Sequence, residues 1–322
     1  MSSLLQQLKS LRLGVTPYGK APHKPILMLA VIDGFGKGYL AEQVVPICPE
    51  LLTSFHDYWK LLVHTPHVPN FSLPFFHLGS EPSGIWQLQT MPGKTIPVTK
   101  SNSIKSFKAL QETVQAAQLS VELFQALSHP LQREELKKAI LQQYFPNTAQ
   151  RLAENYPTVS DDIRNDILYD PSENYARKLI QRFEQLNPAE REEEVIVRSH
   201  IFKKAVLQFY ENRCAISGLK IETPNQVSMV DACHIVPFAE SFDDTIPNGI
   251  ALAPPLHRAF DRGLLTISTD YRVVTNPKIK DYSPANGIEQ FNQKEIYLPT
   301  DKRFFPSPEK LKAHGIRFAF YG

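Results

Sequence analysis

Three neighbouring segments decide the fold of the C-terminal part of this chain: VDACHIVP at residues 230–237, NGIAL at 248–252 and PPLHRAFDRG at 254–263. The first is rich in β-branched residues and ends at a proline, which predicts a strand. The second predicts a turn and a short strand. The third has prolines at its start and a glycine at its end, which predicts a helix. We therefore expect two strands and a helix, with an Asp- and Ser-rich loop at 238–247.

The polar side chains of this unit suit hydrolysis of a phosphodiester. That reaction needs a base to activate water, a cation to stabilise the developing charge, and a group that orients the base. His234 suits the first role, because imidazole titrates near neutral pH. His257, together with an acidic group, suits cation binding. Asn248 suits the third role, or gives its carbonyl oxygen to the metal.

Two carboxylates, Asp231 and Asp261, are the candidate acidic metal ligands beside His257. On a flat strand Asp231 and His234 face opposite sides, so a bulge would be needed to bring them together. Asp261 follows His257 by one helical turn and is either a ligand or a support for one. For either Asp, a purely structural role is the alternative. A hard ion such as Mg²⁺ or Mn²⁺ is expected, and a His ligand also makes Zn²⁺, Co²⁺ or Ni²⁺ acceptable.

The cysteines Cys48, Cys214 and Cys233 form no CxxC pair, so neither structural zinc nor a disulfide framework is expected. Cys214 and Cys233 are interpreted as small buried apolar residues. The fold must then be held by ordinary packing.

These segments resemble the HNH endonuclease superfamily, in the branch that reads D-A-A-H-I-V-P, then N-G-L, then H-x-x-F-D. His234, Asn248 and His257 match the H, N and H. Residues 206–218, VLQFYENRCAISG, resemble the family's preceding V-L-x-x-Y-x-x-R-C-x-x-S/T-G, and the resemblance covers roughly 195–315. It implies a ββα-metal nuclease domain in which His234 is the general base, His257 is a metal ligand and Asn248 positions the loop or the base. Many members have Asp or His as a ligand just before the base, where this chain has Cys233.

A second resemblance concerns the N-terminal part, over about residues 8–150. APHKPILMLA at 21–30, LPFFHL at 73–78, GIWQL at 84–88 and LQQYFP at 141–146 are similar to motifs of sulfur-binding domains. Such domains precede HNH domains in McrA-like type IV restriction endonucleases, which recognise phosphorothioate-modified DNA. The resemblance implies a DNA-recognition domain.

The candidate DNA contacts lie in or beside the first two of these motifs. A reader of phosphorothioate needs a cation for the charge and an apolar cup for the soft, poorly hydrated sulfur, and a helix start also favours anions. The predicted contacts are Tyr18, Lys20, His23, Lys24, Leu73, Pro74 and His77. Leu73 and His77 replace the family's Tyr and small residue, so a methylated or hydroxymethylated base is the alternative mark.

The chain is predicted to be α+β, with a mixed helix and strand domain at 1–150, a helical linker at 151–194 and the nuclease domain at 195–322. Helices are expected at 2–13, 26–32, 50–62, most of 103–145 and 197–210. Strands are expected at 71–78 and 84–89, with a further strand and turn at 213–218. The acidic run at 190–194 is interpreted as a solvated linker or helix face.

The uneven charge of the chain is compatible with a nucleic-acid-binding surface, and ordinary scatter of charged residues is the alternative. Residues 1–110 carry ten Lys or Arg against five Asp or Glu, which fits a phosphate-facing surface. No apolar run reaches the ~18 residues of a membrane helix, and the N-terminus lacks a signal-peptide pattern, so a cytoplasmic protein without a membrane partner is expected.

The leading hypothesis is a modification-dependent endonuclease acting on double-stranded DNA, as a homodimer because two strands must be cut. One alternative is a non-catalytic DNA-binding protein with a degenerate HNH fold. Another is a nuclease effector or toxin that cuts unmodified DNA.

Overall fold

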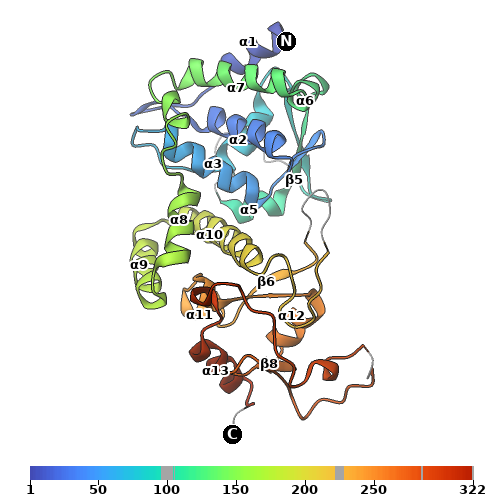
Figure 1. Ribbon diagram of the computed structural model, residues 1–322. Helices are drawn as coiled ribbons and strands as arrows, with labels where there is room; N and C mark the ends of the chain where they lie inside the picture. The colour runs from blue at the N-terminus through green and yellow to red at the C-terminus, as the bar shows by residue number, and fades with distance from the viewer. Residues whose placement is uncertain (96–103, 105, 222–227, 284–285, 321–322) are drawn as a thin grey trace. The chain divides into compact units, whose positions relative to one another are not determined.

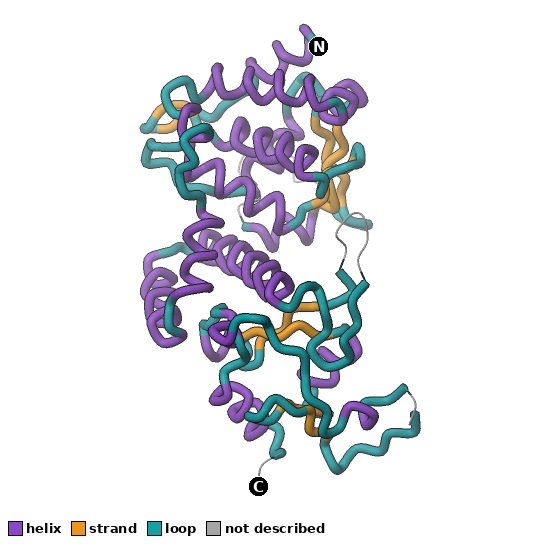
Figure 2. Tube along the Cα trace, in the orientation of Figure 1, coloured by secondary structure: helices purple, strands orange, loops and turns teal. Residues whose placement is uncertain are grey.

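The computed structural model of the protein describes residues 1–95, 104, 106–221, 228–283 and 286–320 (Figure 1). The chain divides into two compact units, each with its own core. Unit 1 comprises Met1–Asp162 and Leu186–Val197, and unit 2 comprises Ile163–Gln185 and Arg198–Gly322. Both contain helices and short strands, so the predicted α+β class is confirmed (Figure 2).

Unit 1 is a set of helices beside a small antiparallel sheet. Its helices are α1 Ser2–Lys9, α2 His23–Lys37, α3 Pro49–Leu62, α4 Ser72–His77, α5 Phe107–Thr113, α6 Val121–Ser128 and α7 Pro130–Tyr144. Its strands are β1 Val15–Thr16 and β2 Gly19–Lys20, which form a hairpin, and β3 Val44–Pro46, β4 Trp86–Thr90 and β5 Val114–Leu119, with β5 in the middle of a three-stranded sheet. Helix α2 is buried along most of its length, so the unit is built around it.

Unit 2 joins a helical part to two small hairpins. Its elements are α9 Ser172–Gln185, β6 Asp231–His234, α11 Phe238–Ser241, β7 Gly249–Leu252, α12 Pro254–Asp261, β8 Leu265–Ile267, β9 Val273–Thr275 and α13 Pro308–Arg317. Two helices contribute to both units: α8 Val159–Tyr169 and α10 Pro188–Phe209. The predicted linker at 151–194 is thus divided between the units. Among the described residues, no helix is both long and apolar enough to cross a membrane.

The strand predicted at 71–78 is wrong, because this segment forms α4 and a short 3-10 turn, Leu78–Ser80. Phe71, Phe75 and Leu78 are all fully buried, at spacings of four and three residues, which is the period of a helix and not of a strand. Pro74 lies in the first helical turn, where a backbone N–H has no partner within the helix.

Three further expectations need correction. The segment 103–145 is not helical throughout, because Val114–Leu119 is the central strand β5. Residues 213–218 form turns and no strand. The acidic run lies within α10, and Glu193 is not solvated: its side chain is 1% exposed and its carboxylate accepts from the Phe71 N–H at 2.9 Å and pairs with His56 Nε2 at 2.9 Å.

Candidate nuclease site

The candidate site is built on the β6–β7 hairpin and helix α12. The two strands pair antiparallel without a register shift, from Asp231 opposite Leu252 to His234 opposite Gly249. Side chains alternate along a regular strand, so Asp231 and Cys233 share one face while His234 leaves from the other. The bulge considered from the sequence is therefore absent from this strand pair.

A group of possible metal ligands gathers where Asp231 and Cys233 meet α12. His257 Nδ1 lies 3.4 Å from Asp231 Oδ2, and His257 Nε2 lies 3.2 Å from Asp261 Oδ2. Cys233 Sγ lies 3.6 Å from Asp261 Oδ1. One ligand atom each from Cys233, His257 and Asp261 falls within 4.8 Å of the other two. Both predicted carboxylates thus contact His257, one at each ring nitrogen.

The donor set of this group fits a divalent transition metal. A thiolate, an imidazole and a carboxylate together suit Zn²⁺, Co²⁺ or Ni²⁺ better than Mg²⁺ or Mn²⁺, which prefer oxygen ligands. Burial, with the nearby charges of Asp261 and Asp231, raises the pKa of the Cys233 thiol well above its usual value. A bound cation reverses this effect, because its charge stabilises the thiolate.

Cys233 is the site residue that the sequence interpretation missed. The sequence predicts a buried apolar residue at this position, and Cys233 is indeed only 2% exposed. Two signals could have identified it: it stands directly before His234, and it is two residues from Asp231, so both side chains face the same way on a strand.

His234 belongs to a different group of contacts. Its Nε2 lies 2.8 Å from Asp244 Oδ1, and its ring stacks on Phe202 with centroids 4.0 Å apart and an interplanar angle of 7°. The His234 side chain is 19% exposed, whereas that of Asp244 is 2% exposed. The imidazole is thus held on one edge and one face but still reaches solvent.

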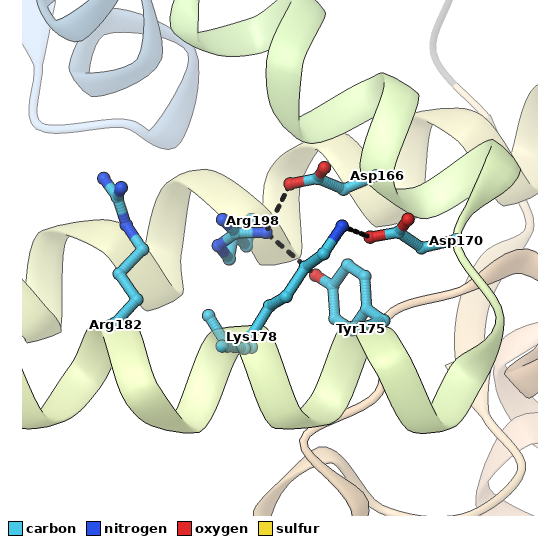
Figure 3. Close-up of a pocket in the computed structure, with 7 residues that line it drawn as sticks. Asp166, Asp170, Tyr175, Lys178, Arg182 and Arg198 are labelled. Atoms are coloured by element: carbon cyan, nitrogen blue, oxygen red, sulfur yellow. Dashed lines mark hydrogen bonds and ion pairs between the residues drawn. The ribbon is translucent and has the colours of Figure 1, made fainter.

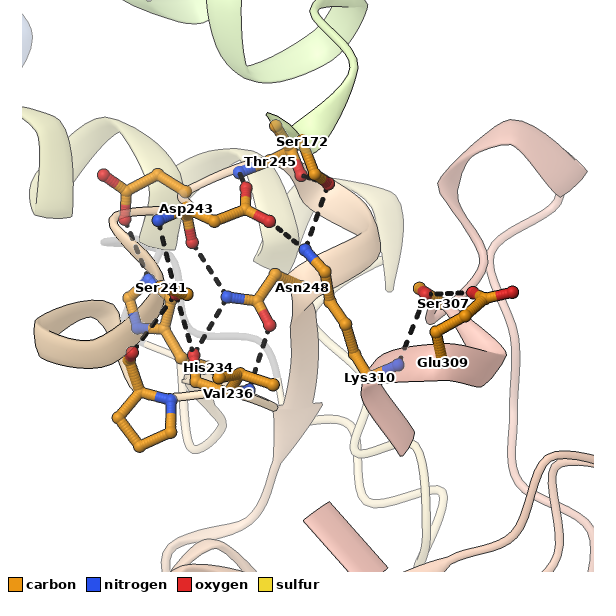
Figure 4. Close-up of polar contacts among 12 residues, drawn as sticks. Ser172, His234, Val236, Ser241, Asp243, Thr245, Asn248, Ser307, Glu309 and Lys310 are labelled. Atoms are coloured by element: carbon orange, nitrogen blue, oxygen red, sulfur yellow. Dashed lines mark hydrogen bonds and ion pairs between the residues drawn. The ribbon is translucent and has the colours of Figure 1, made fainter. Parts of the chain in front are cut away.

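Asn248 fixes the loop between the strands (Figure 4). It is fully buried, its Nδ2 donates to the carbonyls of Val236 at 3.0 Å and Asp243 at 2.8 Å, and its Oδ1 accepts from the Val236 N–H at 3.0 Å. These bonds fit the positioning role expected from the sequence. They do not fit a metal ligand, because the carbonyl oxygen is already used inside the loop.

The three residues of the H, N and H pattern are therefore not gathered into one contact group. Among the described residues, His257 contacts Asp231 and Asp261, while His234 contacts Asp244 and Phe202. The two groups meet at the consecutive positions 233 and 234, at the end of β6. His234 and His257 therefore belong to two adjacent groups on opposite faces of one strand.

The predicted DNA contacts of unit 1 divide into exposed and buried residues. Tyr18 is 54% exposed and Lys20 is exposed on the β1–β2 hairpin. Lys24 is not a free cation, because its side chain is 11% exposed and forms an ion pair with Glu81, which is 4% exposed. His23 donates from Nε2 to the Val68 carbonyl at 3.0 Å, and burial lowers its pKa to about 4. His23 is thus a neutral donor whose Nε2–H is bonded to the Val68 carbonyl.

The remaining predicted contacts lie on helix α4. Leu73 is half-buried, Pro74 is buried and His77 is half-buried. Burial and the nearby charge of Lys24 lower the pKa of His77. His77 therefore lies close to Lys24, which links α4 to the start of α2.

An aromatic group beside the hairpin was missed from the sequence. His67 lies edge-on to Tyr18 at 5.7 Å and to His23 at 6.3 Å, and His23 lies 4.6 Å from Trp59. Both His67 nitrogens are engaged, with Thr16 Oγ1 at 2.7 Å and Thr65 Oγ1 at 2.6 Å. Nothing local in the sequence places the loop near residue 67 against the hairpin.

Comparison with known proteins supports the assignment of the C-terminal part. Residues 214–268 match the HNH endonuclease family, so the resemblance predicted from the sequence is confirmed for the segment that holds β6, β7 and α12. The match therefore identifies this segment as an HNH endonuclease domain.

Two solved structures are similar to parts of the chain. One is described as "Modification dependent TagI restriction endonuclease": it is 24% identical, with a TM-score of 0.29, over 38% of this chain and 38% of that chain. The chain thus spans well under half the length of that relative. The other is described as "Structure of the Type IV phosphorothioation-dependent restriction endonuclease ScoMcrA": it is 10% identical, with a TM-score of 0.34, over 79% of this chain and 93% of that chain. No match was found among curated proteins.

Proposed function

We propose that the protein is a modification-dependent endonuclease, in which residues 1–150 bind marked DNA and the HNH part hydrolyses a phosphodiester bond. The observation that carries the catalytic half is the gathering of Cys233, His257 and Asp261 directly beside His234, within the segment that matches HNH endonucleases. Helix α12 brings His257 and Asp261 together at a spacing of four residues, and a divalent cation would account for the buried Cys233 thiol that faces them.

The roles of the residues follow from their contacts. His234 accepts a proton from the attacking water, because it is a partly exposed imidazole held against a buried carboxylate. Cys233, His257 and Asp261 would hold the divalent ion, with Asp231 on the other nitrogen of His257. When bound, that ion supplies positive charge to the developing oxyanion. Asn248 fixes the loop that follows the base.

Phosphorothioate is the leading candidate for the mark. It is supported by the order of the N-terminal motifs and by an exposed Tyr18 and Lys20, which suit contacts with the DNA backbone. Leu73 and Pro74 stay as candidate walls of an apolar cup. Methylated or hydroxymethylated cytosine is the second candidate, because the aromatic group of Tyr18, His67 and His23 offers flat ring surfaces that suit a base better than a phosphate.

The nuclease part is proposed to act as a homodimer with one divalent ion in each copy. A single site of this kind cuts one strand, so a double-strand break needs two copies. Sedimentation of the protein with and without marked DNA tests this proposal: a monomer on DNA under cleaving conditions would contradict it.

The test of the proposed function is cleavage of four plasmids that carry phosphorothioate, methylcytosine, hydroxymethylcytosine or no mark, at stated salt, with Mn²⁺, Mg²⁺, Co²⁺, Ni²⁺, Zn²⁺ or a chelator. We expect metal-dependent cutting of one marked plasmid and loss of at least a hundredfold in rate in His234→Ala. His129→Ala is the matched control, because His129 is an exposed histidine whose side chain makes no capping bond. Equal cutting by His234→Ala would overturn the base assignment. Equal cutting of all four plasmids would favour a nuclease effector over restriction.

A further inference from the structure

A chain of buried polar contacts leads from helix α10 through α9 to His234. Arg198 Nη1 donates to Tyr175 Oη at 3.1 Å, and Figure 3 draws both side chains. Tyr175 Oη donates to Asp244 Oδ2 at 3.2 Å, and Asp244 Oδ1 accepts from His234 Nε2 at 2.8 Å. Tyr175 and the side chain of Asp244 are both 2% exposed, and the Arg198 side chain is 7% exposed. Buried polar groups in such a chain are held in fixed orientations.

The hydrogen atoms along this chain can be placed from chemistry. Arginine only donates, so the hydroxyl oxygen of Tyr175 accepts from it and its hydrogen is free to point at Asp244. A carboxylate only accepts, so the second oxygen of Asp244 requires a hydrogen on His234 Nε2. In a neutral imidazole the lone pair then lies on Nδ1. The stack on Phe202 fixes the plane of the same ring.

We infer that Tyr175 and Asp244 are positioning residues that hold His234 in the Nε2–H tautomer and leave Nδ1 as the proton acceptor. This inference rests on the proposed role of His234 as the base. It assigns Tyr175, from a segment that the sequence interpretation treated as a linker, to the catalytic half of the protein. In the other tautomer the hydrogen would lie on Nδ1, so this nitrogen could not accept a proton from the attacking water.

A second contact explains why α9 can carry this role. Ser172 Oγ lies 3.0 Å from Thr245 Oγ1 and accepts from Lys310 Nζ at 3.1 Å, and Lys310 pairs with Asp243 (Figure 4). Ser172 and Tyr175 are three residues apart on one face of α9. Helix α9 therefore contacts the loop at two adjacent residues, Thr245 and Asp244. The residues 163–185 that contain α9 also group with unit 2 and not with unit 1.

The test compares cleavage by Tyr175→Phe and Asp244→Asn with the parent. Tyr175→Phe keeps the buried ring and removes only the hydroxyl. Asp244→Asn offers one oxygen to two donors, so His234 and Tyr175 can no longer both be satisfied. We expect kcat to fall about ten-fold in Tyr175→Phe and on the order of a hundred-fold in Asp244→Asn, with KM for DNA unchanged, because a slightly misplaced base slows only the chemical step.

Tyr210→Phe is the matched control. Tyr210 is also buried in unit 2, but its hydroxyl has no hydrogen-bond partner among the described residues. Removing that hydroxyl should leave kcat unchanged. A similar loss in Tyr210→Phe would show that the effect of Tyr175→Phe is a general effect of removing a buried hydroxyl, and would overturn the inference.

The tautomer is a readout that does not depend on activity. In metal-free protein with ¹⁵N-labelled histidine, at alkaline pH, we expect the ring signals of His234 to show hydrogen on Nε2. The signals are assigned by their loss in His234→Ala. In Asp244→Asn the signals should move toward the Nδ1–H form. An Nδ1–H tautomer in the parent protein would overturn the inference even if no variant cuts DNA.

The two proposals fail in different ways. If His234→Ala is inactive while Tyr175→Phe and Asp244→Asn cut like the parent, the positioning role is wrong and the base assignment stands. If His234→Ala cuts like the parent, the base assignment is wrong and the positioning role loses its basis.

Discussion

Cys233 is the residue whose chemistry best discriminates between possible metal sites. Its thiol lies within 4.8 Å of ligand atoms of His257 and Asp261. Thiolates bound to Co²⁺ give an intense near-ultraviolet absorption that carboxylates and imidazoles do not give. We expect the Co²⁺-loaded protein to show this band, and Cys233→Ala to lose it together with about ten- to hundred-fold in Co²⁺ affinity.

Cys214→Ala is the control for this substitution, because Cys214 is equally buried and its Sγ accepts from the Ser217 N–H at 3.4 Å, away from the possible metal ligands found among the described residues. The Cys214→Ala variant should keep the near-ultraviolet band of the Co²⁺-loaded protein. A Co²⁺ spectrum without the band in the parent protein would exclude Cys233 as a ligand and leave His257 with the two carboxylates.

The buried imidazole of His314 is expected to make the stability of unit 2 depend on pH. Its ring accepts from the Thr266 hydroxyl at 2.8 Å, donates to the Phe260 carbonyl at 3.2 Å and is 4% exposed. Burial lowers its pKa from 6.5 to about 4, so below pH 6.5 the unfolded chain binds a proton that the folded chain does not. The contribution of His314 to the free energy of unfolding is therefore complete above pH 6.5. It decreases by about 3 kcal/mol as the pH drops toward 4.

The matched variant for this prediction is His314→Gln, whose amide can still donate and accept but does not titrate. We expect its free energy of unfolding, followed by urea denaturation across this pH range, to fall less steeply than that of the parent. Parallel curves would contradict the assignment of the effect to His314.

At the scale of the element, Glu193 joins the first part of α10 to α3 and α4 within unit 1. Its carboxylate receives hydrogen bonds from Phe71, at the start of α4, and from His56 on α3. In Glu193→Gln one of these donors faces an NH₂ group, so we expect a loss of about 1–3 kcal/mol in the free energy of unfolding of unit 1. Glu112→Gln makes the same chemical change at an exposed position of α5 and should be neutral. Equal unfolding midpoints for the two variants would show that the buried contact stabilises nothing.

The elements that the sequence predicted well are those with a strong local pattern. Helices α3 and α12 and the strands β6 and β7 have clear end signals, and the structure contains all four. The segment at 72–77 was mistaken because four of its six residues are apolar or proline, and so short an apolar run does not distinguish a strand from a helix. β5 was missed because its sequence VQAAQL has little β-branching and owes its place to pairing on both sides.

The site was predictable only where its contacts are local. The spacing of His257 and Asp261 reveals their contact, because four residues make one helical turn. The partner of Tyr175 is Asp244, 69 residues further along the chain, and no periodicity points to such a pair. The same holds for Glu193 and Phe71, 122 residues apart, which is why a charged run was interpreted as solvated.

At the scale of the whole molecule, the division into units groups α9 with the β6–β7 hairpin and α12 in unit 2. Tyr175, Leu179 and Phe183 form a stripe on α9 at spacings of four residues, and all three are 2–5% exposed. Phe183 packs near Phe242, with ring centroids 6.3 Å apart. Burial of each such side chain contributes about 1.5–3 kcal/mol to the stability of the folded state. A nuclease part that starts at residue 195, as the sequence suggested, would lose this stripe and leave the second oxygen of Asp244 without its donor.

We therefore expect a fragment of residues 158–322, which keeps the contacts of Thr158 with Asp161 at the start of α8, to unfold cooperatively and to nick DNA in a metal-dependent manner. A fragment of residues 195–322 should be less stable by several kcal/mol, because the faces that α9 covers become exposed to water. Thermal unfolding of both fragments measures the difference, and His234→Ala in the longer one checks that nicking is its own. Equal melting temperatures would mean that α9 is a connector after all, and that the contacts of Ser172 and Tyr175 with the loop at 243–245 add nothing to the fold of the nuclease part.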